Sequence, residues 1–185
     1  MSRMRRAFER LQNAAGRVPL LPSPYPLEAP TFGPGCCAGE LEELQAAFRH
    51  PLPSDYTEFL GMCRRVVAAD VFNGYYLYSP LRLSLPGTDN AAPGRLHVGS
   101  EPHLEEVWVF AVGGDGSGNQ FIMGCGAARH GHVWKWSHEA EVRFDGVASQ
   151  GLTHLSDSFS GLLERMADDW EHFCTHDRTW QYMSG

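Results

Sequence analysis

The sequence lacks any long apolar run. None of its 185 residues lie in a stretch apolar enough to cross a membrane, and arginines interrupt the N-terminal segment where a signal peptide would need an unbroken apolar core. The five cysteines include no CxxC pair, which indicates free thiols in a reducing compartment. We therefore expect a cytoplasmic protein with no membrane partner and no cofactor.

Positive charge is scarce outside the N-terminus. Residues 1–17 carry five arginines and one glutamate, whereas the rest of the chain has ten basic and 21 acidic residues, a net charge of −11. Phosphate contacts need a basic face, so this body is poorly suited to nucleic acid. An acidic body favours a basic protein partner, because opposite potentials speed encounter.

Signatures of common active sites are also missing. The chain has no Gly-x-Ser-x-Gly elbow. The glycine-rich stretch 113–119 has neither the glycine spacing of a dinucleotide fingerprint nor the Gly-Lys-Ser/Thr of a P-loop, and it lacks the last carboxylate of an EF-hand loop. Its four glycines predict a tight reversal between two strands instead. We expect no catalytic residues and a protein that is not an enzyme.

Histidine and cysteine give two weak candidates for chemistry. His130 and His132 are two apart on a predicted strand, so both side chains point to one side, and Asp115, His138 or Glu139 could add a third metal ligand. Cys125 with His130 could form a thiol nucleophile and its base. Two histidines at this spacing are more typical of a surface, so we predict no metal site. A metal-dependent enzyme using His130, His132 and His138 remains the lesser alternative.

Four segments have the apolar spacing of helices. In residues 3–15, Met4, Phe8, Leu11 and Ala15 share one face among arginines, which predicts an amphipathic helix resting on the acidic domain, with a membrane-surface or targeting helix as alternatives. Residues 19–39 hold six prolines and predict an extended connection. Further helices are expected over 41–48, over 54–67 with Ser54 as the N-cap, and from Phe159 onward with Ser156 or Ser158 as the cap.

Between the helices the apolar period changes to that of strands. Strands are expected at 76–78, 81–85, 95–98, 107–112, 119–123, 132–136 and 142–144. Their aromatic residues are more typical of a core or a protein interface than of nucleobase stacking. These aromatics are Trp108, Phe110, Phe121, Trp134 and Trp136. The pattern predicts an α+β fold, a single mostly antiparallel sheet with N-terminal helices and a C-terminal helix packed on it.

In chain order, these segments resemble the SUKH superfamily, the Smi–Knr type of domain. The resemblance covers about residues 35–173. The matching segments are an acidic helix start at 39–44, Leu52-Pro53 followed by Tyr56, Phe59 and Leu60, the turn Asn73-Gly74-Tyr75, the apolar strand and glycine-rich turn 110–119, the strand end 133–139, and Ser158-Phe159 with Leu162. We accordingly expect an extension over 1–34 and a SUKH-like domain over 35–185.

The resemblance implies a bacterial immunity protein. Such proteins bind and neutralise a cognate toxin domain, often a nuclease, by protein–protein contact, and no catalytic residues carry over. A regulatory scaffold or peptide-binding module using the proline-rich segment is the alternative. Acidic residues in or beside expected loops are the candidates for contacting a basic toxin. They are Glu101, Glu105, Glu106, Asp115 and Asp145.

Overall fold

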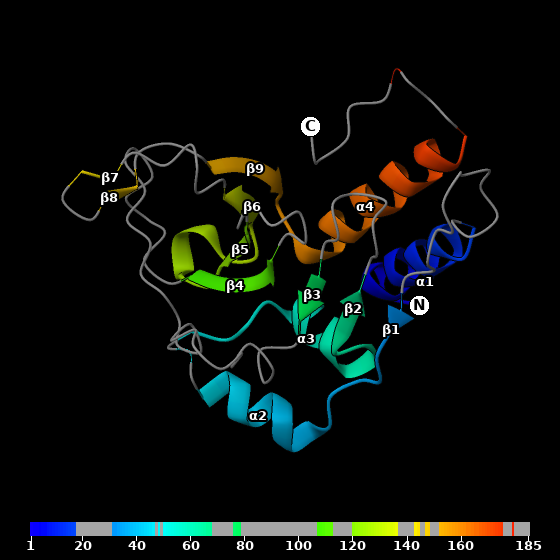
Figure 1. Ribbon diagram of the computed structural model, residues 1–185. Helices are drawn as coiled ribbons and strands as arrows, with labels where there is room; N and C mark the ends of the chain where they lie inside the picture. The colour runs from blue at the N-terminus through cyan, green and yellow to red at the C-terminus, as the bar shows by residue number, and fades with distance from the viewer. Residues whose placement is uncertain are drawn as a thin grey trace.

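The fold combines four helices and nine strands within the described part of the chain (Figure 1). The computed structural model describes residues 1–17, 31–46, 48, 50–67, 76–78, 107–112, 120–136, 143–144, 147–148, 152–175 and 179. The helices are α1 (Arg3–Ala15), α2 (Ala38–Ala46), α3 (Ser54–Met62) and α4 (Phe159–Cys174), with a short 3-10 turn at Ala127–Arg129. Among these, no helix has the length and apolarity needed to span a membrane.

Seven strands form one antiparallel sheet in the order β1-β2-β3-β4-β5-β6-β9. Their bounds are β1 (Thr31–Phe32), β2 (Arg65–Val67), β3 (Tyr76–Tyr78), β4 (Val107–Val112), β5 (Gln120–Gly124), β6 (Val133–Trp136) and β9 (Leu152–Ser156). The α+β class is thus confirmed. The expected single sheet is wrong in one detail, because β7 (Arg143–Phe144) pairs with β8 (Val147–Ala148) in a separate hairpin.

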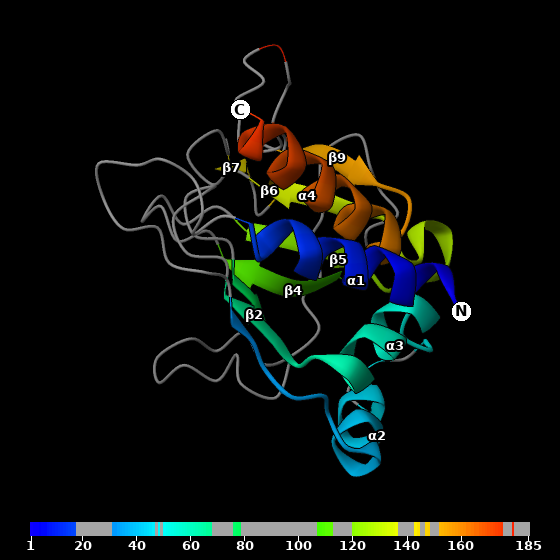
Figure 2. The same cartoon turned by 90° about the vertical axis from the view of Figure 1, so that its right-hand side faces the viewer.

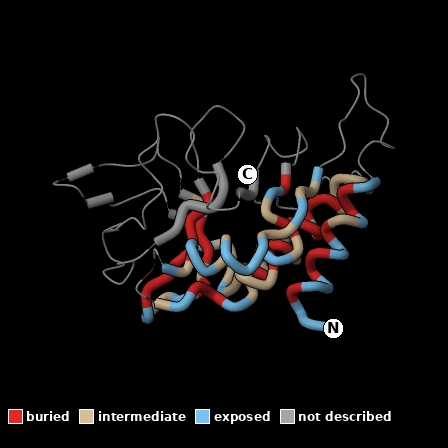
Figure 3. The backbone as a smooth tube through the Cα atoms, turned by 90° about the horizontal axis from the view of Figure 1, so that it is seen from below, coloured by how far each residue is buried: buried red, intermediate tan, exposed pale blue. Residues whose placement is uncertain are grey.

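Helices α1 and α4 cover one face of the sheet (Figure 2). Phe121 and Met123 of β5 belong to the same buried cluster as Leu11 of α1 and Trp170 of α4. Buried and exposed positions alternate along α1 from the N-terminus, as the period of an amphipathic helix requires (Figure 3). The N-terminal helix is therefore part of the core, and the boundary at residue 34 stays a prediction.

Exposed ion pairs connect α1 to α4. Arg3 donates two hydrogen bonds to Glu164, and Arg10 donates two to Glu171, both pairs 161 residues apart, so the helices run parallel. Arg10 also pairs with Asp168 at 2.6 Å. These bonds lower the pKa of the Glu164 and Glu171 carboxyls. The amphipathic helix on an acidic surface is confirmed.

The third helix is shorter than its apolar spacing predicts. Helix α3 ends at Met62, because Cys63 is extended at φ −153° and ψ 115°, and the chain continues as β2. Val67, expected on the helix, instead pairs with β1 and β3. Ser54 is inside the helix and Pro53 holds the N-cap position, so the expected Ser54 cap is wrong.

The expected closing helix is confirmed with Ser158 as its cap. The Ser158 hydroxyl accepts from the amide of Gly161, and Asp55 of α3 accepts from the amide of Ser160 at 2.7 Å. Two otherwise unpaired donors of the first turn of α4 are thereby satisfied. Strands at 76–78 and 107–112 are confirmed, and those at 119–123, 132–136 and 142–144 differ only at their ends. The segments 81–85 and 95–98 lie outside the described residues.

Candidate functional site

The connection from β5 to β6 fixes the position of His132. The amide of Gly131 donates to the carbonyl of Gly124, and the amide of Gly124 donates to the carbonyl of His132, both at 2.9 Å. Gly131 has φ +84°, a left-handed conformation that glycine adopts without strain. The loop therefore closes tightly and delivers His132 to the start of β6.

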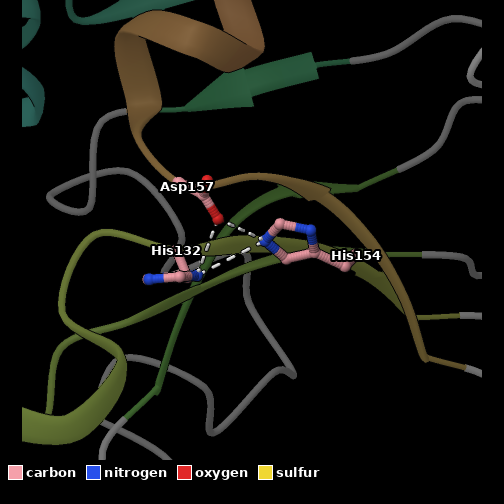
Figure 4. Close-up of side chains that lie close together, drawn as sticks. All are labelled: His132, His154 and Asp157. Carbon is pink, nitrogen blue, oxygen red and sulfur yellow. Dashed lines mark hydrogen bonds and ion pairs between the residues drawn. The ribbon is translucent and has the colours of Figure 1, made fainter.

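Strand pairing and a corner bring two more polar side chains to His132 (Figure 4). In the β6–β9 ladder, His154 is directly opposite Trp134. Asp157 follows β9 and immediately precedes Ser158, the N-cap of α4. His132, His154 and Asp157 therefore come from three different positions of the fold and converge.

The three donor atoms form a small triangle. His132 Nδ1 is 3.4 Å from His154 Nε2, and each of these nitrogens is 3.2 Å from Asp157 Oδ1. The exposed fraction of the side chain rises from 26% for His132 to 47% for His154 and 81% for Asp157. The triangle thus opens to solvent on the side of the carboxylate.

Trp134 supports the two imidazole rings. Its indole lies nearly parallel to His132, with ring centroids 5.9 Å apart and planes 22° apart. It meets His154 edge-on at 5.8 Å and 67°. Because Trp134 is 5% exposed, it holds both rings against a buried surface.

Two kinds of chemistry fit this arrangement. Both imidazoles could donate an N–H to the same carboxylate oxygen, or all three atoms could bind one cation through their lone pairs. Within the part of the chain that the structure describes, these are the only three His, Cys, Asp or Glu donors close enough together to hold a metal ion.

The structure separates two of the histidines that the sequence offered as the lesser alternative, a metal-dependent enzyme. His130 is exposed, and its Nε2 contacts the carbonyl oxygen of Pro51, away from the triangle. The positive φ of Gly131 breaks the strand geometry that would have aligned His130 with His132. His138 lies outside the described residues. Of His130 and His132, only His132 is in the cluster, together with His154 and Asp157.

Burial argues against Cys125 as a nucleophile with His130 as its base. The Cys125 thiol is fully buried and donates toward the carbonyl of Met123 at 3.8 Å. A buried thiol of this kind lacks the electropositive, accessible setting of a reactive cysteine. All five cysteines are free, and burial raises the pKa of the Cys63 and Cys174 thiols.

The acidic contact residues expected from the sequence cannot be located in the structure. Glu101, Glu105, Glu106, Asp115 and Asp145 lie outside the described residues. Of the aromatics, Phe121 and Trp134 are buried, at 1% and 5% exposure, as a core predicts. Their neighbours in β4 and β6 have a described backbone only.

Comparison with known proteins adds no relative. The sequence matches no protein-family model, and no match was found among curated proteins. Fold and site together define an α+β protein with two helices on one sheet face and a His–His–Asp cluster at the β6–β9 corner.

Proposed function

We propose that this protein is a non-catalytic binding module of the SUKH type, which neutralises a cognate toxin domain by protein–protein contact. The observation that carries the proposal is the agreement between the matching segments and the elements in which they lie. Leu52-Pro53 precedes α3, whose Tyr56, Phe59 and Leu60 are all buried. Such a match of residue type with burial supports a shared fold.

In the later matching segments, residue type also agrees with the element in which the segment lies. The apolar run 107–112 is β4, and the chain returns antiparallel as β5 after the glycine-rich stretch. The segment with Val133 and Trp134 is β6, in which both side chains are buried. Ser158-Phe159 begins α4 with a side-chain cap. The order and the structural context of the segments therefore support the proposal jointly.

An acidic surface for a basic toxin is available on α2. Glu42 and Glu43 are exposed, and no ion pair engages either of them within the described residues. Glu40, one turn earlier in the same helix, is already committed to Arg64 at 2.9 Å, and the amide of Cys37 lowers the pKa of its carboxyl. We infer that Glu42 and Glu43 contact the toxin together with the acidic residues named from the sequence.

The test is co-expression with the protein encoded by the adjacent gene. We expect a stable complex and protection of cells from that protein's toxicity. The double substitution Glu42→Lys and Glu43→Lys should slow association several-fold, and more strongly at low salt, because steering by charge is screened by ions. Glu9→Lys on α1, also an exposed glutamate, is the matched control and should leave association unchanged. Absence of both complex and protection would refute the proposal.

The alternative is a regulatory scaffold that uses the proline-rich segment. Deleting residues 1–34 would not test this alternative cleanly. That deletion would take Met4, Phe8 and Leu11 out of the core, so any loss of activity would follow from unfolding. Replacing the prolines of 19–30 by alanine leaves α1 in place. Toxin binding should survive this change, whereas a scaffold that uses the segment should lose its partner.

A further inference from the structure

We propose that His132, His154 and Asp157 bind a divalent transition-metal ion of the zinc class at the β6–β9 corner (Figure 4). The inference does not depend on the proposed toxin partner, because it concerns the side chains of this chain alone. It differs from the set suggested by the sequence, which grouped His132 with His130 and His138.

The size of the donor triangle matches a coordination sphere. Zinc binds imidazole nitrogen and carboxylate oxygen at about 2.0–2.1 Å, so two donors in tetrahedral geometry are about 3.3–3.4 Å apart. The observed edges are 3.2, 3.2 and 3.4 Å. One ion above the plane of the three atoms can therefore reach all of them without movement of the backbone.

The donor types select the class of ion. Two imidazoles with one carboxylate suit zinc and neighbouring first-row metals, whereas calcium and magnesium prefer a shell of oxygens. Three protein donors leave one tetrahedral position for water or for a side chain of another molecule. The 81% exposure of Asp157 directs that open position to solvent.

The site is organised before any ion arrives. Trp134 stacks on His132 and contacts His154, and Trp134 is itself buried. The β6–β9 ladder fixes His154 opposite Trp134, two residues along the chain from His132. Asp157 is held beside the capped start of α4. Binding an ion would therefore require little further ordering of these side chains, which favours affinity. The bound ion would connect the start of β6 to β9 and to the residue before α4.

The experiment is titration of the full chain, free of any histidine tag and kept reduced, with Zn²⁺ and with Co²⁺. We expect one ion per chain, a rise in Tm with Zn²⁺, and a Co²⁺ spectrum with d–d bands but without thiolate charge-transfer absorption. The Co²⁺ spectrum matters because the five free thiols are the competing ligands. His154→Gln and Asp157→Asn should each weaken binding by at least about tenfold.

His130→Gln is the matched control. His130 is an exposed histidine two residues from His132, but its ring contacts Pro51 and not the triangle. Affinity in this variant should equal that of the unchanged protein. The proposal would be overturned by absence of stoichiometric binding, by thiolate bands in the Co²⁺ spectrum, or by equal losses in His130→Gln and His154→Gln. Titration of the unchanged protein decides the first two outcomes even if a variant fails to fold.

Discussion

Two polar regions of the molecule, the contact between α1 and α4 and the β6–β9 corner, differ in how their charged side chains are arranged. Between α1 and α4, Arg3 and Arg10 meet carboxylates in two-pronged hydrogen bonds at the rim of an apolar contact. At the β6–β9 corner, the ring nitrogens of two imidazoles and a carboxylate oxygen of Asp157 converge on one point. The first arrangement is complete as it stands, whereas the second gains from a cation.

The two regions therefore differ in what their polar side chains do: those between α1 and α4 surround a buried contact, whereas those at the corner are available for binding. In the helix layer, charge surrounds buried residues such as Phe8 and Leu11, which supply most of the stabilisation. At the corner, buried Trp134 packs behind two imidazole rings that are themselves partly exposed to solvent. Substitutions of the buried residues between α1 and α4 should therefore change stability, and substitutions of the three donor residues at the corner should change metal binding.

The largest effect should come from Phe8→Ala. Phe8 is 7% exposed and meets Phe32 and Phe59 edge-to-face at 5.7 and 5.6 Å. Removing the ring should lower the free energy of unfolding by about 3–5 kcal/mol, because it opens a cavity in a packed core. Urea unfolding should remain a single transition. The zinc affinity of the folded variant should stay the same, since the corner is untouched.

Arg5→Ala is the control on the same helix. Arg5 is exposed, and its loss should change stability by less than about 0.5 kcal/mol. If Phe8→Ala were equally mild, or melted α1 in a separate transition, α1 would be an extension and the boundary at residue 34 would gain support. A single large loss would instead place α1 within the folding unit.

Local periodicity predicts much of this fold. The face of Met4, Phe8 and Leu11 indicates α1, and the continuous apolar run 107–112 indicates β4. The same criterion fails at β2, because Cys63 and Val67 continue the helical spacing of α3 while the backbone extends at Cys63. Spacing alone does not say where a helix stops.

The candidate site depends on pairing that no local pattern encodes. Strand β9 has Thr153 and His154 exposed, so it lacks the alternation of a half-buried strand. His154 and Asp157 are three apart, a spacing that would be read on a helix. Only the register that sets His154 opposite Trp134 brings them to His132. The sequence does show His154, the second histidine downstream of His132, but only long-range strand pairing brings it to His132.

A smaller effect is expected from Gly131→Ala at the corner. Gly131 has φ +84°, and an added Cβ would approach nothing closer than Pro53 at 3.7 Å. The loss therefore comes from backbone strain alone, about 1–2 kcal/mol. Relaxation of the loop would move His132, so zinc affinity should fall as well.

Gly61→Ala separates strain from mere bulk. Gly61 is in α3, where an added Cβ meets nothing within 4 Å, so this change should leave stability unchanged or slightly raised. Calorimetric melting and Zn²⁺ titration of both variants make the measurement. If Gly131→Ala left both Tm and affinity intact, the loop would not be what positions His132.

The smallest effect should come from Glu171→Gln, and it should depend on pH. The hydrogen bonds from Arg10 hold the folded pKa of Glu171 below its ordinary value of 4.5. A lowered folded pKa means that the contribution is fully present above pH 4.5 and is lost as pH falls through the folded pKa. Because the pair is partly exposed, the difference from the unchanged protein should be only about 0.5 kcal/mol at neutral pH.

This difference in stability should vanish in acid and shrink with salt. Glu42→Gln, with no ion pair among the described residues, is the control and should show no such dependence. A difference that persisted in acid would assign the role of Glu171 to packing, and would remove the electrostatic contrast between the helix layer and the corner.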